Sequence, residues 1–234
     1  MLIDTVVTLF GFAVPCLFLI LAWWISTPMG FSTATLMFGV LATLGMDNTI
    51  PMFGHGVVGG STYFPAMFLT IAFCAKKFGV DQALSMVNCV TRGMALFAVA
   101  QFRWLFFALY APEHTTHSVA EAMALGRNAV LMTGIVYLGG VTILSSRKML
   151  ADYSVHARLA VPVYVDILLM SPISILSVFS NENGQFTSTQ SWNDTILWTL
   201  VTRLSVPFIV ISTLYLFGNY KTAAALEEKD VESE

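Results

Sequence analysis

The chain alternates between long apolar stretches and short polar segments, and this pattern predicts its architecture. Each apolar stretch is close in length to the roughly 20 residues that an α-helix needs to cross a bilayer. The chain has seven such stretches, and if the second one, at about 31–53, is re-entrant and does not cross, six spans remain. The pattern predicts an all-α membrane protein, a polytopic bundle of about six to seven transmembrane helices. The seven stretches are at about 5–25, 31–53, 54–81, 82–110, 128–145, 159–179 and 192–217.

The third stretch, Gly54–Asp81, has the most informative internal order. Four glycines between positions 54 and 60 allow positive φ angles and a close approach of backbones. Pro65 suits the first turn of a helix, where a missing N–H has the least effect. Lys76 and Lys77 close the apolar run and indicate a cytoplasmic end. This order predicts a membrane helix with a glycine-rich mouth.

The distribution of charge supports a membrane protein and predicts its orientation. Only 11% of the residues are charged and 56% are hydrophobic, whereas a soluble domain carries about 25% charged residues. If all stretches cross, Lys76-Lys77, the Arg147–Arg158 loop and Lys221 lie on one side. The positive-inside rule then places the C-terminus in the cytoplasm and the N-terminus outside. We expect a multi-pass protein of the cell (inner) membrane. We expect residues 1–220 to form the bundle and residues 221–234 to be an acidic, disordered tail.

Motifs of soluble catalysis and of cofactor binding are absent from the sequence. It contains no P-loop, dinucleotide fingerprint, HExxH, CxxC or GxSxG pattern. The last stretch has no lysine for retinal, and the histidines lie in loops or at span ends, where they could not hold haem. His114 and His117 lie in a polar loop without further ligands nearby, which favours solvated side chains over a metal site. The sequence therefore predicts no enzyme, cofactor, metal or nucleic-acid partner, and favours transport, channel or sensing roles.

Ionisable residues within the apolar stretches are the strongest functional signal, because an unpaired charge in hydrocarbon is costly. Such residues can form ion pairs that fix helix packing, as Asp47 with Arg92 or Asp166 with Arg203. They can instead line a polar cavity, in which carboxylates and amides accept hydrogen bonds from a ligand's N–H groups and aromatic side chains stack on its ring. The candidate substrate-binding residues are Asp47, Asn48, Tyr63, Phe64, Arg92, Asn128, Asp166 and Arg203.

Residues 63–84, YFPAMFLTIAFCAKKFGVDQAL, resemble the signature of the VUT family, the queuosine-precursor transporters. Arg127 before a small-residue helix is similar to the family's fifth segment. Arg158, followed by a helix carrying Asp166, resembles a later segment, and Arg203 resembles a basic residue that precedes a proline in the last helix. The residues that match the signature itself are Phe64, Pro65, Phe68, Leu69, Lys77, Phe78, Gly79 and Ala83.

The resemblance covers about residues 30–217 and implies a compact bundle of about six helices. It also implies uptake of a 7-deazapurine such as preQ0 or preQ1, with a small-molecule substrate and the lipid bilayer as partners. Two other classes of protein fit the same charges. One is a membrane-embedded sensor or assembly subunit, in a homo-oligomer or with a membrane partner subunit. The other is an ion or proton channel, in which the charged groups line one continuous path. The chain departs from the VUT pattern in one helix: the family usually has acidic residues in the helix after its FP motif, at positions where this chain has Thr70, Ile71, Ala72 and Ala75.

Overall fold

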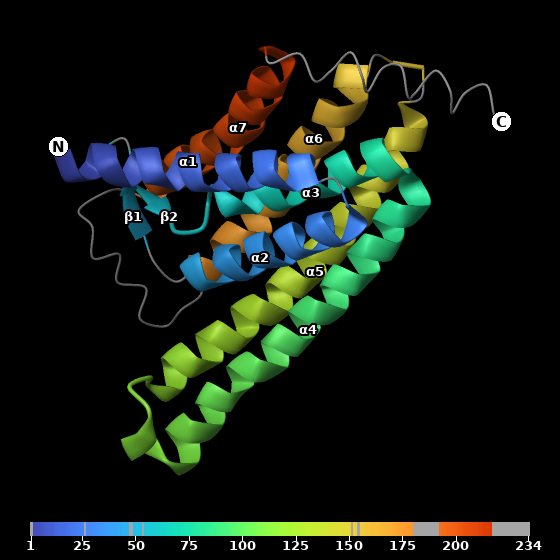
Figure 1. Ribbon diagram of the computed structural model, residues 1–234. Helices are drawn as coiled ribbons and strands as arrows, with labels where there is room; N and C mark the ends of the chain where they lie inside the picture. Colours follow the sequence, from blue (N-terminus) through green and yellow to red (C-terminus); the bar gives the residue numbers. More distant parts are fainter. Residues whose placement is uncertain are drawn as a thin grey trace.

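The fold is known from a computed structural model, which describes residues 2–25, 27–46, 49–52, 54–150, 152–153, 155–179 and 192–216. Within these ranges the chain is mainly helical (Figure 1). A short hairpin of β1 (Thr49–Met52) and β2 (His55–Val58) precedes α3, and a single 3₁₀ turn, η1 (Pro112–His114), joins α4 to α5. The helices are α1 (Leu2–Ile25), α2 (Pro28–Gly45), α3 (Tyr63–Phe78), α4 (Val80–Tyr110), α5 (Val119–Met149), α6 (Val155–Phe179) and α7 (Trp192–Leu216).

Five helices of the described chain are long and apolar enough to cross a membrane, namely α2, α4, α5, α6 and α7. The apolar segment of α1, Thr8–Leu21, is shorter. The predicted all-α membrane protein is therefore confirmed. The second predicted stretch, at about 31–53, has different bounds from the helix that forms there. α2 begins at Pro28, and Thr27 caps it by accepting a hydrogen bond from the Gly30 N–H at 3.1 Å. It ends at Gly45, before the hairpin begins.

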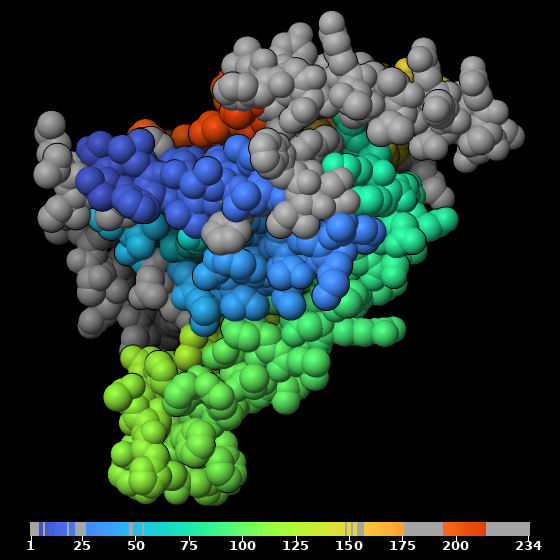
Figure 2. Space-filling model, viewed as in Figure 1, coloured from blue at the N-terminus to red at the C-terminus, as the bar shows by residue number. Residues whose placement is uncertain are grey.

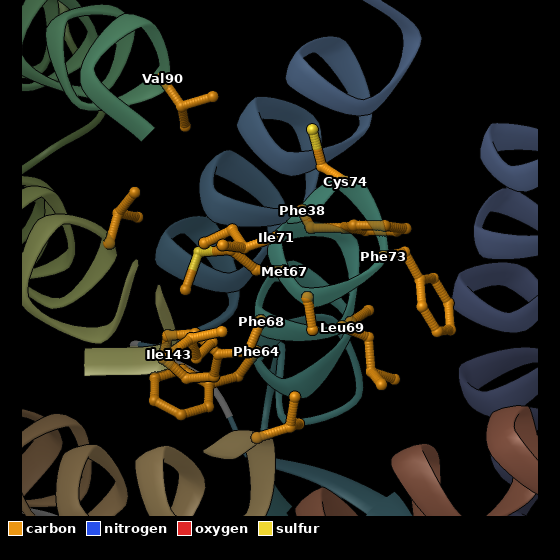
Figure 3. Packing of buried hydrophobic residues seen from close by; sticks show 14 of the residues in the cluster. Phe38, Phe64, Met67, Phe68, Leu69, Ile71, Phe73, Cys74, Val90 and Ile143 are labelled. Atoms are coloured by element: carbon orange, nitrogen blue, oxygen red, sulfur yellow. The ribbon is translucent and has the colours of Figure 1, made fainter. Parts of the chain in front are cut away.

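α3 is the central helix of the bundle. Its 16 residues give a length of about 24 Å at about 1.5 Å per residue, which is less than the roughly 30 Å of a hydrocarbon core. Every residue from Phe64 to Ala75 is buried, and Figure 3 shows its side chains, among them Leu69, Phe73 and Cys74, pointing in different directions into the core. The third predicted span is thus a core helix that is covered by protein on all sides.

Glycines fix the turns at both ends of α3. Gly79 has a φ of 84° and directly joins α3 to α4. At the other end Gly60 has a φ of 78°, and a Cβ there would lie 2.7 Å from the Ala42 carbonyl oxygen. Gly45 is equally tight, because a Cβ there would lie 2.5 Å from the Gly60 nitrogen. The glycine-rich mouth therefore lets the chain after β2 pack backbone to backbone on the end of α2.

The β-hairpin lies against the first half of α7. β1 and β2 pair antiparallel, with Ile50 opposite Val57. The Val58 N–H donates to Thr199 Oγ1 at 3.1 Å, and the His55 ring stacks on Trp198 at 4.2 Å between centroids. In Figure 1 the hairpin lies near one end of the bundle, whereas the C-terminal ends of α3 and α5 lie toward the opposite end.

α4 and α5 form a long antiparallel pair that is inclined to α1, α2 and α3 (Figure 1). Each has 31 residues, which is about 46 Å of helix. A helix longer than the bilayer thickness is accommodated by such a tilt. Small residues on α5 permit close packing: a Cβ at Gly140 would lie 2.7 Å from Val87 on α4, although Gly134 faces open space.

Candidate functional site

Arg203 is the centre of a buried polar cluster at the junction of α3, α6 and α7. Its side chain is only 1% exposed. Its Nη1 donates to Ser174 Oγ on α6 at 2.6 Å, and its Cζ lies 4.1 Å from the centroid of the Phe64 ring on α3. A desolvated cation over an aromatic face gains about 2 kcal/mol. A hydroxyl and a ring therefore hold this guanidinium in place.

Further hydroxyl groups surround the cluster on α6 and α7. Thr195, Thr199 and Thr202 recur every three or four residues of α7, so they share one face, and all three are fully buried. Thr199 accepts the hydrogen bond from β2. Within the described residues no hydrogen-bond partner is found for the Oγ atoms of Ser171, Thr195 and Thr202, or for Nε of Arg203. Buried polar atoms are normally satisfied, so this concentration of unsatisfied atoms marks a site suited to a polar ligand.

Asp166 lies on the inward face of α6, about two turns before Ser174. It is fully buried, and neither carboxylate oxygen has a hydrogen-bond partner within the described residues. Eight residues of helix separate it from Ser174, or about 12 Å along the axis. In the described part of the chain Asp166 and Arg203 form no ion pair: both carboxylate oxygens of Asp166 lack a partner, and Arg203 donates to Ser174. The predicted packing pair Asp166–Arg203 is therefore not formed, and the carboxyl remains available to a donor.

The structure brings together only part of the predicted site. Phe64 and Arg203 are in direct contact, while Asp166 and Asn128 are buried on α6 and α5. Tyr63 is half-buried, and its ring stacks on Phe38 at 6.3 Å between centroids. Arg92 is not part of the cluster, because it is exposed on α4. Asp47 and Asn48 lie outside the described residues, so neither their place nor the pair Asp47–Arg92 can be compared with the prediction.

The hydroxyl-bearing residues of the cluster were missed in the sequence. Thr195, Thr199 and Thr202 have near-neutral hydropathy, so they do not interrupt an apolar run as a charged residue does. Their spacing on one face together with Arg203 is the signal that could have revealed them. Ser171 and Ser174 flank Pro172 and gave no periodic pattern.

Neither family models, nor characterised proteins, nor solved structures match the chain. Among the described residues no group of three or more His, Cys, Asp or Glu side chains could hold a metal ion. The buried cluster around Arg203 and the carboxyl of Asp166 are therefore the features from which a function can be inferred.

Proposed function

We propose that this membrane protein is a transporter for the uptake of a small nucleobase-like molecule. The observation that carries the proposal is the carboxyl of Asp166, which is fully buried in a membrane-spanning helix and has no partner within the described residues. A polar group in that environment is costly unless something binds to it, and intramembrane carboxyls mark substrate or ion pathways. A substrate with N–H groups would supply the missing hydrogen bonds.

The chemistry of the neighbouring cluster suits the rest of such a molecule. Nε–H of Arg203 and the hydroxyls of Ser171 and Thr202 can donate to carbonyl or ring-nitrogen acceptors. Phe64 contributes an aromatic wall, and the surrounding side chains of α3 are apolar. Apolar walls with a few placed polar groups are typical of small-molecule sites. A flat heterocycle that has both donors and acceptors on its edge matches this combination.

The resemblance of residues 63–84 to the VUT signature selects the first compounds to test. We propose a 7-deazapurine, such as preQ0 or preQ1, as the substrate. The proposed orientation has the C-terminus in the cytoplasm of a cell whose inner membrane contains the protein. Because the Arg203 cluster is buried, access would require α6, α7 or the β-hairpin to move, as in transporters whose site lies at a helix interface.

A channel is less well supported, because its charged residues would have to line one path. Arg92 is exposed on α4, whereas Asp166 and Arg203 are buried. A role in assembly is favoured by one observation, the exposure of Arg92, and is compatible with transport.

The first test is thermal unfolding of the purified protein in detergent with preQ0, preQ1, queuine, purines and vitamins. A ligand that binds only the folded state stabilises it by about 2.7 kcal/mol at a hundredfold excess over Kd. We expect a rise in Tm with a 7-deazapurine, and no rise in the Asp166→Asn variant. Asp152→Asn is the matched control, because Asp152 is an exposed carboxyl just before α6.

Uptake of the same compound into cells should follow the binding result. Asp166→Asn should abolish uptake while the amount of protein in the membrane stays unchanged, because asparagine has nearly the same shape. Equal loss of protein and of uptake in Asp166→Asn would show a packing role for the carboxyl. No Tm rise with any compound would contradict the proposed substrate class.

A further inference from the structure

The outer face of the first half of α4 carries a polar stripe in an otherwise apolar surface. Its members recur every three or four residues, so they share one face of the helix. They line a groove of about 740 Å³, and in Figure 2 this part of α4 forms an outer edge of the molecule. We call this face the α4 stripe; its residues are Asp81, Leu84, Ser85, Asn88, Cys89, Arg92, Gly93 and Leu96.

Arg92 in this stripe lies near the middle of the membrane. A Cβ at the adjacent Gly93 would be 3.1 Å from the Leu36 side chain of α2. Leu36 is the ninth of the 18 residues of α2 (Pro28–Gly45). Since α2 is about 27 Å long and a hydrocarbon core is about 30 Å thick, the middle of α2 must lie close to the bilayer centre. Arg92, level with Leu36, is therefore also near the centre.

The guanidinium of Arg92 has no partner in the described part of the chain. The Arg92 side chain is exposed, and it forms no hydrogen bond or ion pair with any described residue. At the bilayer centre it is roughly 15 Å from either interface, which is further than the side chain can extend toward water. A charge in this position is costly and is normally paired. The stripe therefore needs an occupant that supplies negative charge at this depth.

Small residues in the α4 stripe leave room for the backbone of another helix. Ser85 and Cys89 are exposed small residues four positions apart, a spacing that lets two transmembrane helices approach closely. Asn88 and Arg92 flank this line and can donate hydrogen bonds across the contact. The small residues set the fit, and the arginine sets the required charge.

A second copy of this chain is a poor occupant. Two copies related by a twofold axis along the membrane normal would place equal depths together, so Arg92 would face Arg92. The carboxyls of the described spans offer no other complement: Asp81, Glu121 and Asp194 lie near the beginnings of their helices, and Asp166 is fully buried. Because no described carboxyl of this chain complements Arg92, a different protein is the source of the acid that we consider.

We propose that the α4 stripe is the docking site for a transmembrane helix of another protein, and that this helix carries a carboxylate level with Arg92. The carboxylate pairs with the guanidinium, Asn88 bonds to the same helix, and the small residues allow the close contact. This inference does not depend on the proposed transport function, because it concerns a different face of the molecule.

The test uses synthetic Leu/Ala transmembrane peptides with one central Asp, Leu or Lys, mixed with the full-length protein in phosphatidylcholine vesicles. Energy transfer between a dye after Glu234 and a dye on the peptide reports association. We expect the Asp peptide to bind about tenfold more tightly than the Leu peptide. Arg92→Leu should remove this preference, Arg92→Lys should retain most of it, and Arg92→Glu should transfer it to the Lys peptide.

Arg103→Leu is the matched control, because Arg103 is also exposed on α4 and instead lies beside Trp104, with its Cζ 4.7 Å from the ring centroid. This variant should behave as the wild type. Equal binding of the Asp and Leu peptides to the wild type, or an unchanged preference in Arg92→Leu, would overturn the proposal. Arg92-dependent energy transfer between two copies of the chain would do the same, because it would identify a second copy as the occupant. So would labelling of Cys89 by a membrane-impermeant maleimide, absent in Cys89→Ala, since it would reveal a water-filled path.

Discussion

Arg203 is a buried cation that is held by neutral groups. Its contacts are the hydroxyl of Ser174 and the face of Phe64, so no buried partner charge has to be desolvated together with it. Because Arg203 has only these two interactions with described residues, each of them is important. A guanidinium that loses a partner in an apolar environment keeps its full desolvation cost.

Ser174→Ala should lower the free energy of unfolding by about 1–3 kcal/mol, because it leaves Nη1 of Arg203 buried without an acceptor. Chemical unfolding in detergent measures the difference. The matched control is Ser205→Ala on the facing helix, whose hydroxyl donates only to the Val201 carbonyl oxygen at 2.7 Å. Its effect should stay within about 0.5 kcal/mol. Equal effects of the two variants would show that the contact between Ser174 and Arg203 contributes nothing.

At the scale of the elements, glycines decide how closely the segments approach. Gly60 and Gly54 have the same φ of 78°, but a Cβ at Gly60 would strike the Ala42 carbonyl oxygen at 2.7 Å, whereas nothing lies within 4 Å of one at Gly54. The backbone strain of a substitution is therefore the same at both positions, and only Gly60 adds a collision with α2.

Gly54→Ala should destabilise the protein by about 1 kcal/mol, the strain of a left-handed alanine. Gly60→Ala should cost at least about 1 kcal/mol more, because the turn after β2 and the end of α2 must also move apart. Thermal unfolding of both variants in the same detergent tests this order. A Gly60→Ala variant that is as stable as Gly54→Ala would mean that the turn after β2 is not packed tightly on α2.

The pair Gly134 and Gly140 on α5 allows a similar comparison within one helix. Gly134→Ala should be neutral or stabilising by up to about 1 kcal/mol, because its Cβ meets open space and alanine favours the helix. Gly140→Ala should be destabilising by about 1–3 kcal/mol through overpacking, since its Cβ would lie 2.7 Å from Val87. Stability measured by unfolding should rank Gly134→Ala above Gly140→Ala, and the reverse order would contradict the close packing of α4 and α5.

The sequence predicted the helices well because apolar length alone determines them in a membrane protein. It could not separate α3 from the spans, since its residues are as apolar as theirs and only the packing of its neighbours removes it from lipid. The hairpin at 49–58 was hidden, because its valines and methionine continue the apolar pattern. Arg92 and Arg203 also looked equivalent. Whether an arginine faces inward depends on the phase of its helix relative to its neighbours, which one sequence does not contain.

At the scale of the whole molecule, two of the basic segments used for the predicted orientation lie at one end of the bundle. Lys76 and Lys77 end α3, and Arg147 lies near the end of α5, at the same end of the bundle in Figure 1. The connection between α4 and α5 projects from the opposite end.

A single cysteine placed at Thr116, in a variant with Cys16, Cys74 and Cys89 changed to Ala, should react with a membrane-impermeant maleimide added to intact cells. A cysteine placed at Asp152 should react only after the membrane is opened, because we expect the loop before α6 to be cytoplasmic. Gel-shift of the labelled protein measures both. Reaction of the Asp152 position in intact cells would invert the proposed orientation.

The full enclosure of α3 also has a consequence for how the protein is made. A 16-residue helix with two lysines in its last turn is a weak candidate for entering the bilayer on its own, because insertion from the ribosome depends on apolar length and charge. Of the segments that enclose it, α1 and α2 are synthesised before it and α4 to α7 after it. During biogenesis α3 must therefore be shielded from lipid and water, by the translocation machinery or by α1 and α2, until the later helices pack around it.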